Sequence, residues 1–187
     1  MKNFSACMLL ADGFEETEAI MTADILKRIG INVSLIGIEN KTIRGTHDFH
    51  ISTNKLINEN TATEFDVVIL PGGLPGTTNL RNSTAVINLI KEAYSNNKIC
   101  AAICAAPIVL RDAGITENKN ITGYPGCEQL SLDPNFNFTG NDVEIDGNII
   151  TAKGMGKSAQ FAFAIAQTLG YTQSEIQKVA NSAFIKY

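Results

Sequence analysis

The sequence predicts a protein of the α/β class, a three-layer sandwich in which helices cover both faces of a mostly parallel sheet. Two observations lead to this class. Short apolar runs of strand length alternate with amphipathic segments of helical period along the chain. Glycine- or cysteine-bearing turns follow four of these runs, at residues 12–13, 72–73, 104 and 154–156. Because the carboxyl ends of parallel strands lie along one edge of a sheet, we expect these turns to converge there on a ligand site.

The first half of the chain predicts a β-α-β unit followed by a short excursion from the main sheet. The expected elements are a strand at residues 5–11, a helix at 16–29 that stops at Gly30, a strand at 32–38, two short strands within 41–53 joined near 44–46, and a buried strand at 65–70 closed by Pro-Gly-Gly at 71–73. Apolar runs of this length predict strands, and apolar residues at helical spacing predict helices. The β-α-β order implies a parallel pair with a right-handed crossover.

The second half continues the alternation around a central strand and turn. The expected elements are a helix at 84–96 capped by Ser83, a strand at 98–103, a turn at Cys104, a helix from Pro107 towards Gly114, an extended pair at 121–122, a loop through 133–134, a hairpin centred on 146–147, a strand at 149–153, a helix at 158–169 that stops at Gly170, and a last short helix. Thr172 and Glu175 form a capping box for that last helix. One domain over residues 1–187 suits this length, which can bury a substantial core.

Charge, hydropathy and cysteine spacing argue against several classes of partner and cofactor. A formal net charge of -4 argues against nucleic acid or an anionic membrane as the main partner. No apolar run approaches the roughly 18 residues of a membrane span. The four cysteines lack the spacing of a disulfide framework or a zinc site, and the sequence holds only two histidines. We therefore expect a cytoplasmic protein with free thiols, no metal site and no cofactor; Gly154-Met155-Gly156 lacks the third glycine of a dinucleotide fingerprint.

Cys104 stands at the predicted turn between a buried strand and a helix. Ala102 and Ala106 flank it two positions away on either side, which is the small-x-nucleophile-x-small spacing of a nucleophile elbow. Unpaired N–H groups at the start of the following helix favour a thiolate, so a depressed thiol pKa is expected. The alternative is a buried core cysteine, because free cysteine is commonly buried.

Two further features would complete a site around this thiol. Glu18 lies one turn into the first predicted helix, where its side chain can face the end of the sheet. It must then be protonated, or share one proton with Cys104, because a charged carboxylate would suppress the thiolate. The backbone N–H groups of Gly73 and Ala105 are expected to form an oxyanion hole. The alternatives are simple helix-start chemistry for Glu18 and a plain turn at Gly72-Gly73.

A cysteine–histidine protease needs an imidazole beside the thiol. His47 and His50 both fall in the predicted excursion, far upstream of Cys104. We expect them to be solvated surface residues. Catalysis by a triad is therefore not expected unless a partner chain supplies one of them.

Four segments together resemble the ThiJ/PfpI superfamily, and within it the bacterial relatives of the Parkinson's-associated protein deglycase, the DJ-one clade. They read ADGFEETEA at 11–19, VILPGGLPG at 68–76, AAICAAP at 101–107 and TAKGMG at 151–156. The resemblance runs nearly from end to end of the chain. It implies a flavodoxin-like fold, a homodimer, and a reactive cysteine, Cys104, hydrogen-bonded to Glu18.

The resemblance also implies what the site does and which residues line it. Relatives act without a cofactor on methylglyoxal, as a glyoxalase, and on early glycation adducts of proteins or nucleotides. Oxidation of the cysteine to a sulfinic acid under oxidative stress and a chaperone role are associated with the family as well. The sequence supports both an enzyme and a redox sensor or chaperone, because each needs an accessible cysteine of low pKa. The expected lining residues are Gly72, Tyr124, Gly154 and Met155.

This sequence departs from the family pattern at three positions. Tyr124 stands where many relatives carry a histidine close to the cysteine, which shifts general acid–base work to Glu18. Met155 replaces a proline that is common between the two glycines. His47 stands where an arginine is frequent near the dimer contact. Together with Asp24 and Arg28 of the first predicted helix, His47 is a candidate contact between two copies of the chain.

Overall fold

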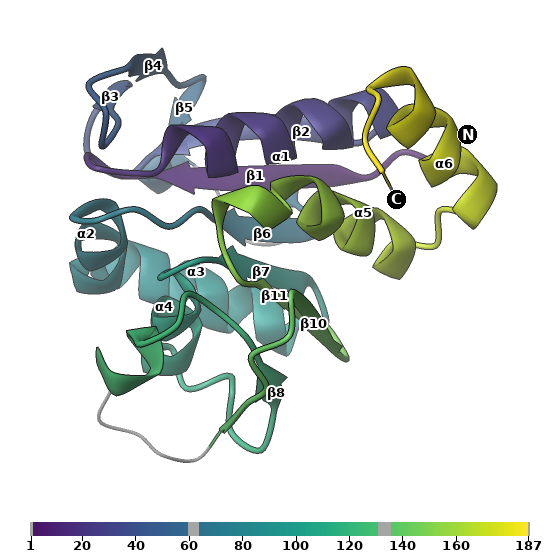
Figure 1. Ribbon diagram of the computed structural model, residues 1–187. Coiled ribbons are helices and arrows are strands. Elements are labelled where there is room, and N and C mark those ends of the chain that lie inside the picture. Colours follow the sequence, from purple (N-terminus) through teal and green to yellow (C-terminus); the bar gives the residue numbers. More distant parts are fainter. Residues whose placement is uncertain (1, 60–63, 131–135, 187) are drawn as a thin grey trace.

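A seven-stranded sheet in the order β10-β11-β7-β6-β1-β2-β5 forms the centre of the molecule (Figure 1). The computed structural model describes residues 2–59, 64–130 and 136–186. Neighbouring strands of the sheet are parallel except β10 and β11, which form an antiparallel hairpin. The predicted α/β class with a mostly parallel sheet is confirmed.

The strands of this sheet come from both halves of the chain. They are β1 (Ser5–Leu10), β2 (Asn32–Gly37), β5 (Lys55–Leu56), β6 (Val67–Leu70), β7 (Ile99–Ile103), β10 (Val143–Asp146) and β11 (Ile149–Ala152). Two small pairs lie outside it: β3 (Thr42–Arg44) with β4 (His50–Ser52), antiparallel, and β8 (Asn120–Ile121) with β9 (Asn137–Phe138), parallel. The predicted excursion within residues 41–53 is therefore confirmed as the β3–β4 hairpin.

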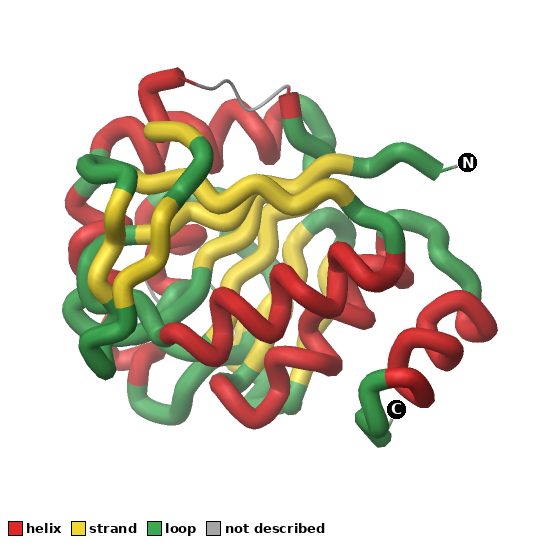
Figure 2. Tube along the Cα trace, turned by 90° about the horizontal axis from the view of Figure 1, so that it is seen from above, coloured by secondary structure: helices red, strands yellow, loops and turns green. Residues whose placement is uncertain are grey.

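Helices cover both faces of the sheet, as Figures 1 and 2 show. The helices are α1 (Glu16–Ile29), α2 (Gly76–Asn82), α3 (Thr84–Ser95), α4 (Pro107–Asp112), α5 (Ser158–Thr168) and α6 (Gln173–Ser182), with single 3-10 turns at η1 (Ile57–Glu59), η3 (Cys127–Leu130) and η4 (Met155–Lys157). Helices α1 and α5 pack side by side on one face, and α2, α3 and α4 lie on the other.

The alternation of side chains along β1 explains the two cores. Ala6, Met8 and Leu10 point into the core under α1 and α5, while Cys7 and Leu9 point into the core on the opposite face. Successive residues of a strand face opposite sides of its sheet, so a strand covered on both faces must be apolar throughout. This arrangement brings the carboxyl ends of β1, β6 and β7 together at one edge, next to the start of α1.

Some elements differ from the sequence expectations. Helix α2 and the short strands β5 and β9 were not expected. The loop expected through residues 133–134 lies outside the described residues. Among the described residues, no helix combines the length and apolar character needed to cross a bilayer.

Candidate active site

Cys104 occupies a strained turn at the carboxyl end of β7. Its φ of 64° lies in the left-handed region, which is uncommon for a residue with a side chain and is enriched at functional sites. Main-chain bonds hold the turn: Cys104 N–H donates to the Ala152 carbonyl at 2.9 Å, and Tyr124 N–H donates to the Cys104 carbonyl at 2.7 Å. The flanking Ala102 and Ala106 are fully buried. The geometry is that of the predicted elbow, with the thiol half-buried at its tip.

Gly72 and Gly73 are glycines because the chain passes very close to the elbow. A Cβ atom on Gly72 would lie 2.7 Å from Cys104 Cβ and 2.8 Å from Glu18 Oε2, closer than carbon atoms pack. Gly73 has a φ of 89°, and a Cβ there would collide with the backbone of residues 13–15. Any larger residue at either position would push the loop after β6 away from the thiol.

Glu18 faces the site from the first turn of α1 and is almost completely buried, with 1% of its surface exposed. Its backbone N–H donates to the side chain of Glu15, the N-cap residue, at 2.6 Å. Its Oε2 atom accepts a hydrogen bond from Gly72 N–H at 2.8 Å. Its Oε1 atom is buried and has no hydrogen-bond partner within the part of the chain that the structure describes. The carboxyl group lies close enough to the Cys104 thiol for each group to shift the pKa of the other.

The pKa values of these two groups depend on each other. Burial raises the pKa of Glu18 to about 7, against the opposing hydrogen bonds from Gly72 and Cys104. Burial and the negative charge of Glu18 raise the pKa of Cys104 to about 12, although N–H groups of Ala105 and Gly73 directed at the sulfur lower it. The depressed thiol pKa expected from the helix start is therefore wrong for a thiol beside an ionised Glu18. One negative charge is shared by the pair near neutral pH, and a thiolate requires a protonated Glu18.

A cavity of about 510 Å³ opens in front of the thiol. Its lining residues are Glu15, Glu18, His47, Cys104, Tyr124, Pro125, Lys153, Gly154, Met155, Gly156 and Lys157. Tyr124 and Met155 expose more than half of their surface at its rim. Gly154 keeps the floor open, since a Cβ there would stand 3.9 Å from the Cys104 sulfur and 4.0 Å from Glu18 Oε1. The cavity is large enough for a substrate of more than a few atoms.

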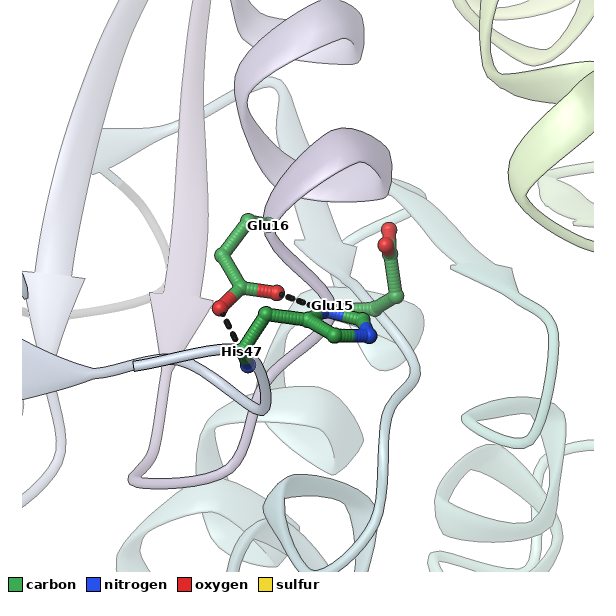
Figure 3. A group of neighbouring side chains, drawn as sticks. All are labelled: Glu15, Glu16 and His47. Atoms are coloured by element: carbon green, nitrogen blue, oxygen red, sulfur yellow. Dashed lines mark hydrogen bonds and ion pairs between the residues drawn. The ribbon is translucent and has the colours of Figure 1, made fainter. Parts of the chain in front are cut away.

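His47 enters this cavity from the β3–β4 loop. Figure 3 shows its ring beside Glu16, with Glu15 adjacent at the start of α1. His47 Nδ1 lies 2.9 Å from Glu16 Oε2, and His47 N–H donates to Glu16 Oε1 at 2.6 Å. One ligand atom from each of these three residues lies within 4.8 Å of the others, so the group could hold a metal ion. Both oxygens of Glu16 already bond to His47, however, which is the geometry of a carboxylate–imidazole pair.

The structure brings most of the predicted site residues together. Cys104, Glu18, Gly72, Gly73, Ala105, Tyr124, Gly154 and Met155 all surround or line the same space. Asp24 and Arg28 lie elsewhere, on the exposed side of α1, where they form an ion pair at 2.6 Å. Sequence reasoning missed Lys153 and Lys157, which were hidden among ordinary surface charges. It expected His47 at the surface, where 65% of the side chain is indeed exposed, but it did not place His47 at the cavity of Cys104, because no local pattern reveals how the β3–β4 loop folds over α1.

Comparisons with known proteins agree with this geometry. Protein dj-1beta of Drosophila melanogaster is 35% identical over 185 residues, covering 98% of both chains. The Parkinson disease protein 7 homolog of Danio rerio is 33% identical over 167 residues, covering 88% of both. The crystal structure of Drosophila melanogaster DJ-1beta matches with a TM-score of 0.93 at 35% identity and full coverage of both chains. The structure of oxidized Toxoplasma gondii DJ-1 matches with a TM-score of 0.90 at 26% identity, covering 98% of this chain and 100% of the other.

The family assignment covers most of the molecule. Residues 4–168 match the DJ-1/PfpI family, a range that includes the elbow, the glycine loop and the start of α1. The four segments singled out in the sequence all fall within it. The chain belongs to the DJ-1/PfpI family.

Proposed function

We propose that this protein is a cofactor-free enzyme that uses Cys104 to act on reactive carbonyls, namely methylglyoxal and early glycation adducts of proteins or nucleotides. The observation that carries the proposal is that a buried Glu18 and Cys104 line the same cavity and shift each other's pKa. A carboxyl group with a pKa near 7 can give and take protons at neutral pH, which is what general acid–base catalysis requires. The size of the cavity supports substrates larger than a three-carbon aldehyde.

The first step is addition of the Cys104 thiolate to the aldehyde carbon of methylglyoxal. A carbon–sulfur bond forms, and the carbonyl electron pair moves to the oxygen. The protonated Glu18 supplies the proton that turns this oxygen into the hydroxyl of a hemithioacetal. The N–H groups of Gly73 and Ala105, which point at the sulfur, are placed to stabilise the negative charge as it moves.

The second step moves hydrogen between the two carbons. Glu18, now ionised, removes the proton from the former aldehyde carbon and returns it to the neighbouring ketone carbon, while the hydroxyl proton on the first carbon passes to the oxygen of the second. The first carbon is oxidised and the second is reduced, so no external oxidant is needed. The product is a lactoyl thioester on Cys104, and water then releases lactate and restores the thiol.

The second candidate function is that of a redox sensor or chaperone switch that uses the same cysteine. Two backbone N–H groups and one carboxyl group surround the sulfur, and these would also stabilise an oxidised sulfur after reaction with peroxide. The similar structure of Toxoplasma gondii DJ-1 is of an oxidized protein. This supports oxidation as a property of the site, alongside catalysis.

We further propose a homodimer in the cytoplasm. Ile20 and Phe49 expose 40% and 65% of their surface around an apolar groove between α1 and the β3–β4 hairpin. Asp24 lines the same groove, and Arg28 pairs with it one turn along α1. The four cysteines are free in the structure, which suits a reducing compartment.

Lactate production from methylglyoxal tests the proposal directly. Wild type should produce lactate, and Cys104→Ser should produce none above background. Glu18→Gln keeps an amide donor beside the sulfur but cannot carry a proton, so its turnover should fall by about 100-fold or more. Negligible turnover by wild type, together with peroxide oxidation of Cys104 that Glu18→Gln alters, would instead assign the sensor function.

A further inference from the structure

The release of product requires a base that takes a proton from water. In the proposed mechanism, water must attack the carbonyl carbon of a thioester on Cys104 and lose a proton as it does so. Glu18 lines the cavity, but only 1% of its surface is exposed, and its Oε2 atom already accepts a hydrogen bond from Gly72 N–H. A base on the solvent-exposed side of the cavity can take this proton at the point where the water enters.

His47 is the imidazole on that side. It lines the same cavity as Cys104, and its side chain is exposed to solvent, where an attacking water would enter. Tyr124, also at the rim, offers a phenol hydroxyl in place of an imidazole nitrogen. The other histidine, His50, lies on β4 and is absent from the residues that line this cavity.

Glu16 fixes the orientation of His47 through two contacts. It is 9% exposed, and each of its oxygens accepts a bond from the same histidine, one from the backbone N–H and one from Nδ1. Burial acts to raise the pKa of Glu16, but the hydrogen bonds from His47 outweigh it, so the carboxylate stays ionised. An ionised carboxylate at Nδ1 keeps the proton on that nitrogen and leaves Nε2 as the acceptor.

The loop that carries His47 is built to hold this contact. Phe14 and Gly45 form an isolated parallel bridge, and Thr46 N–H donates to the Phe14 carbonyl at 2.9 Å. Gly45 has no side chain because a Cβ there would occupy the position of the Glu16 carboxylate. These contacts join the start of α1 to the β3–β4 loop next to His47.

We propose that Glu16 and His47 form a dyad that serves as general base for hydrolysis of the thioester on Cys104, an inference that rests on the proposed function. Nε2 of His47 takes a proton from water as the water oxygen bonds to the thioester carbon. The tetrahedral intermediate collapses, the carbon–sulfur bond breaks, and the carboxylic acid leaves. His47 then returns the proton to the Cys104–Glu18 pair. His47 is the catalytic residue of this step, and Glu16 is a positioning residue.

The lifetime of an acyl group on Cys104 measures this step without methylglyoxal. Brief exposure to p-nitrophenyl acetate places an acetyl group on the thiol, and mass spectrometry follows its loss. In His47→Gln the acetyl group should persist about 100-fold longer than in wild type, and in Glu16→Gln about 10-fold longer. His50→Ala, the matched control, should behave like wild type. Added imidazole should shorten the lifetime in His47→Ala, which a purely structural role would not allow.

The dyad and the proposed function fail in different ways. Wild-type loss of the acetyl group in His47→Gln overturns the dyad and leaves carbonyl chemistry at Cys104 intact. Absence of lactate from methylglyoxal in wild type overturns the proposed function, while the acetyl lifetimes still report on His47. Loss of the deacylation rate on treatment with EDTA, with recovery on adding Zn²⁺, would assign Glu15, Glu16 and His47 to a metal ion and overturn the dyad.

Discussion

At the scale of single residues, the shared charge of Glu18 and Cys104 links the chemistry of the site to the stability of the fold. The folded protein favours protonated Glu18, because its pKa rises from 4.5 to about 7 on folding. A carboxyl group with a raised pKa stabilises the fold fully below pH 4.5 and loses that contribution as the pH rises through 7. The Glu18 carboxyl therefore contributes less to the stability of the fold at pH 8 than at pH 5.

Glu18→Gln should remove this dependence on pH. Between about pH 5 and about pH 8 the free energy of unfolding of wild type should fall by roughly 2 kcal/mol more than that of the variant, since an amide does not titrate. Urea unfolding of both proteins at the two pH values measures the difference. Parallel changes in the two proteins would mean that the Glu18 carboxyl ionises normally in the folded state.

At the scale of elements, the close approach of the β6 loop to the elbow between β7 and α4 controls the reactive geometry. Gly72→Ala places a methyl group 2.7 Å from Cys104 Cβ, so the loop must move. Overpacking of this kind costs about 1–3 kcal/mol of stability, and displacement of the thiol should lower turnover by about 100-fold. Gly156→Ala is the matched control, because it lines the same cavity and a Cβ there meets nothing within 4 Å.

Thermal unfolding and lactate production together check this prediction. The control should retain both its stability and most of its turnover. Equal effects of the two substitutions would show that flexibility of glycine in general matters, and that the contact between Gly72 and Cys104 does not.

The elements that the sequence predicted well are those with local signals. Ser83 accepts from Val86 N–H at the start of α3, Gly30 ends α1 in the left-handed conformation, and Thr172 forms the expected capping box of α6. Helix α2 escaped prediction because its sequence, GTTNLRN, has little helical periodicity, and its N-cap makes no side-chain bond. Strands of two residues, such as β5 and β9, carry too little sequence for a local signal and form by pairing with a neighbouring strand.

Local sequence signals also made part of the site predictable. Residues that reach the site through long-range contacts could not be predicted. Cys104, Glu18 and Gly73 stand in motifs of a few residues each. The place of His47 depends on the bridge between Phe14 and Gly45, a contact between segments 31 residues apart (45 − 14) that leaves no periodic trace. The thiol pKa was misjudged because the sequence does not show how deeply the thiol is buried, and burial is the largest cause of its raised pKa, ahead of the Glu18 charge.

At the scale of the whole molecule, the groove beside α1 predicts how two copies meet. Phe49→Glu places a charge where an apolar side chain exposes 65% of its surface, and it should convert the proposed dimer to a monomer at micromolar concentration. Light scattering coupled to size-exclusion chromatography measures the mass. Phe184→Glu is the control, since Phe184 is 97% exposed near the C-terminus and away from the groove. A dimer that tolerates Phe49→Glu but not Phe184→Glu would place the interface at the other end of the molecule.

The elbow has a consequence for chemistry beyond natural catalysis. The scaffold uses the main-chain N–H and C=O of Cys104 to define the turn, through Ala152 and Tyr124. Neither bond involves sulfur. The identity of the reactive atom is thus separable from its placement, and oxygen or selenium can be installed at the same coordinates by exchanging one side chain. The main chain of the turn therefore fixes the position and direction of whichever atom the side chain of residue 104 carries, next to the Glu18 carboxyl group.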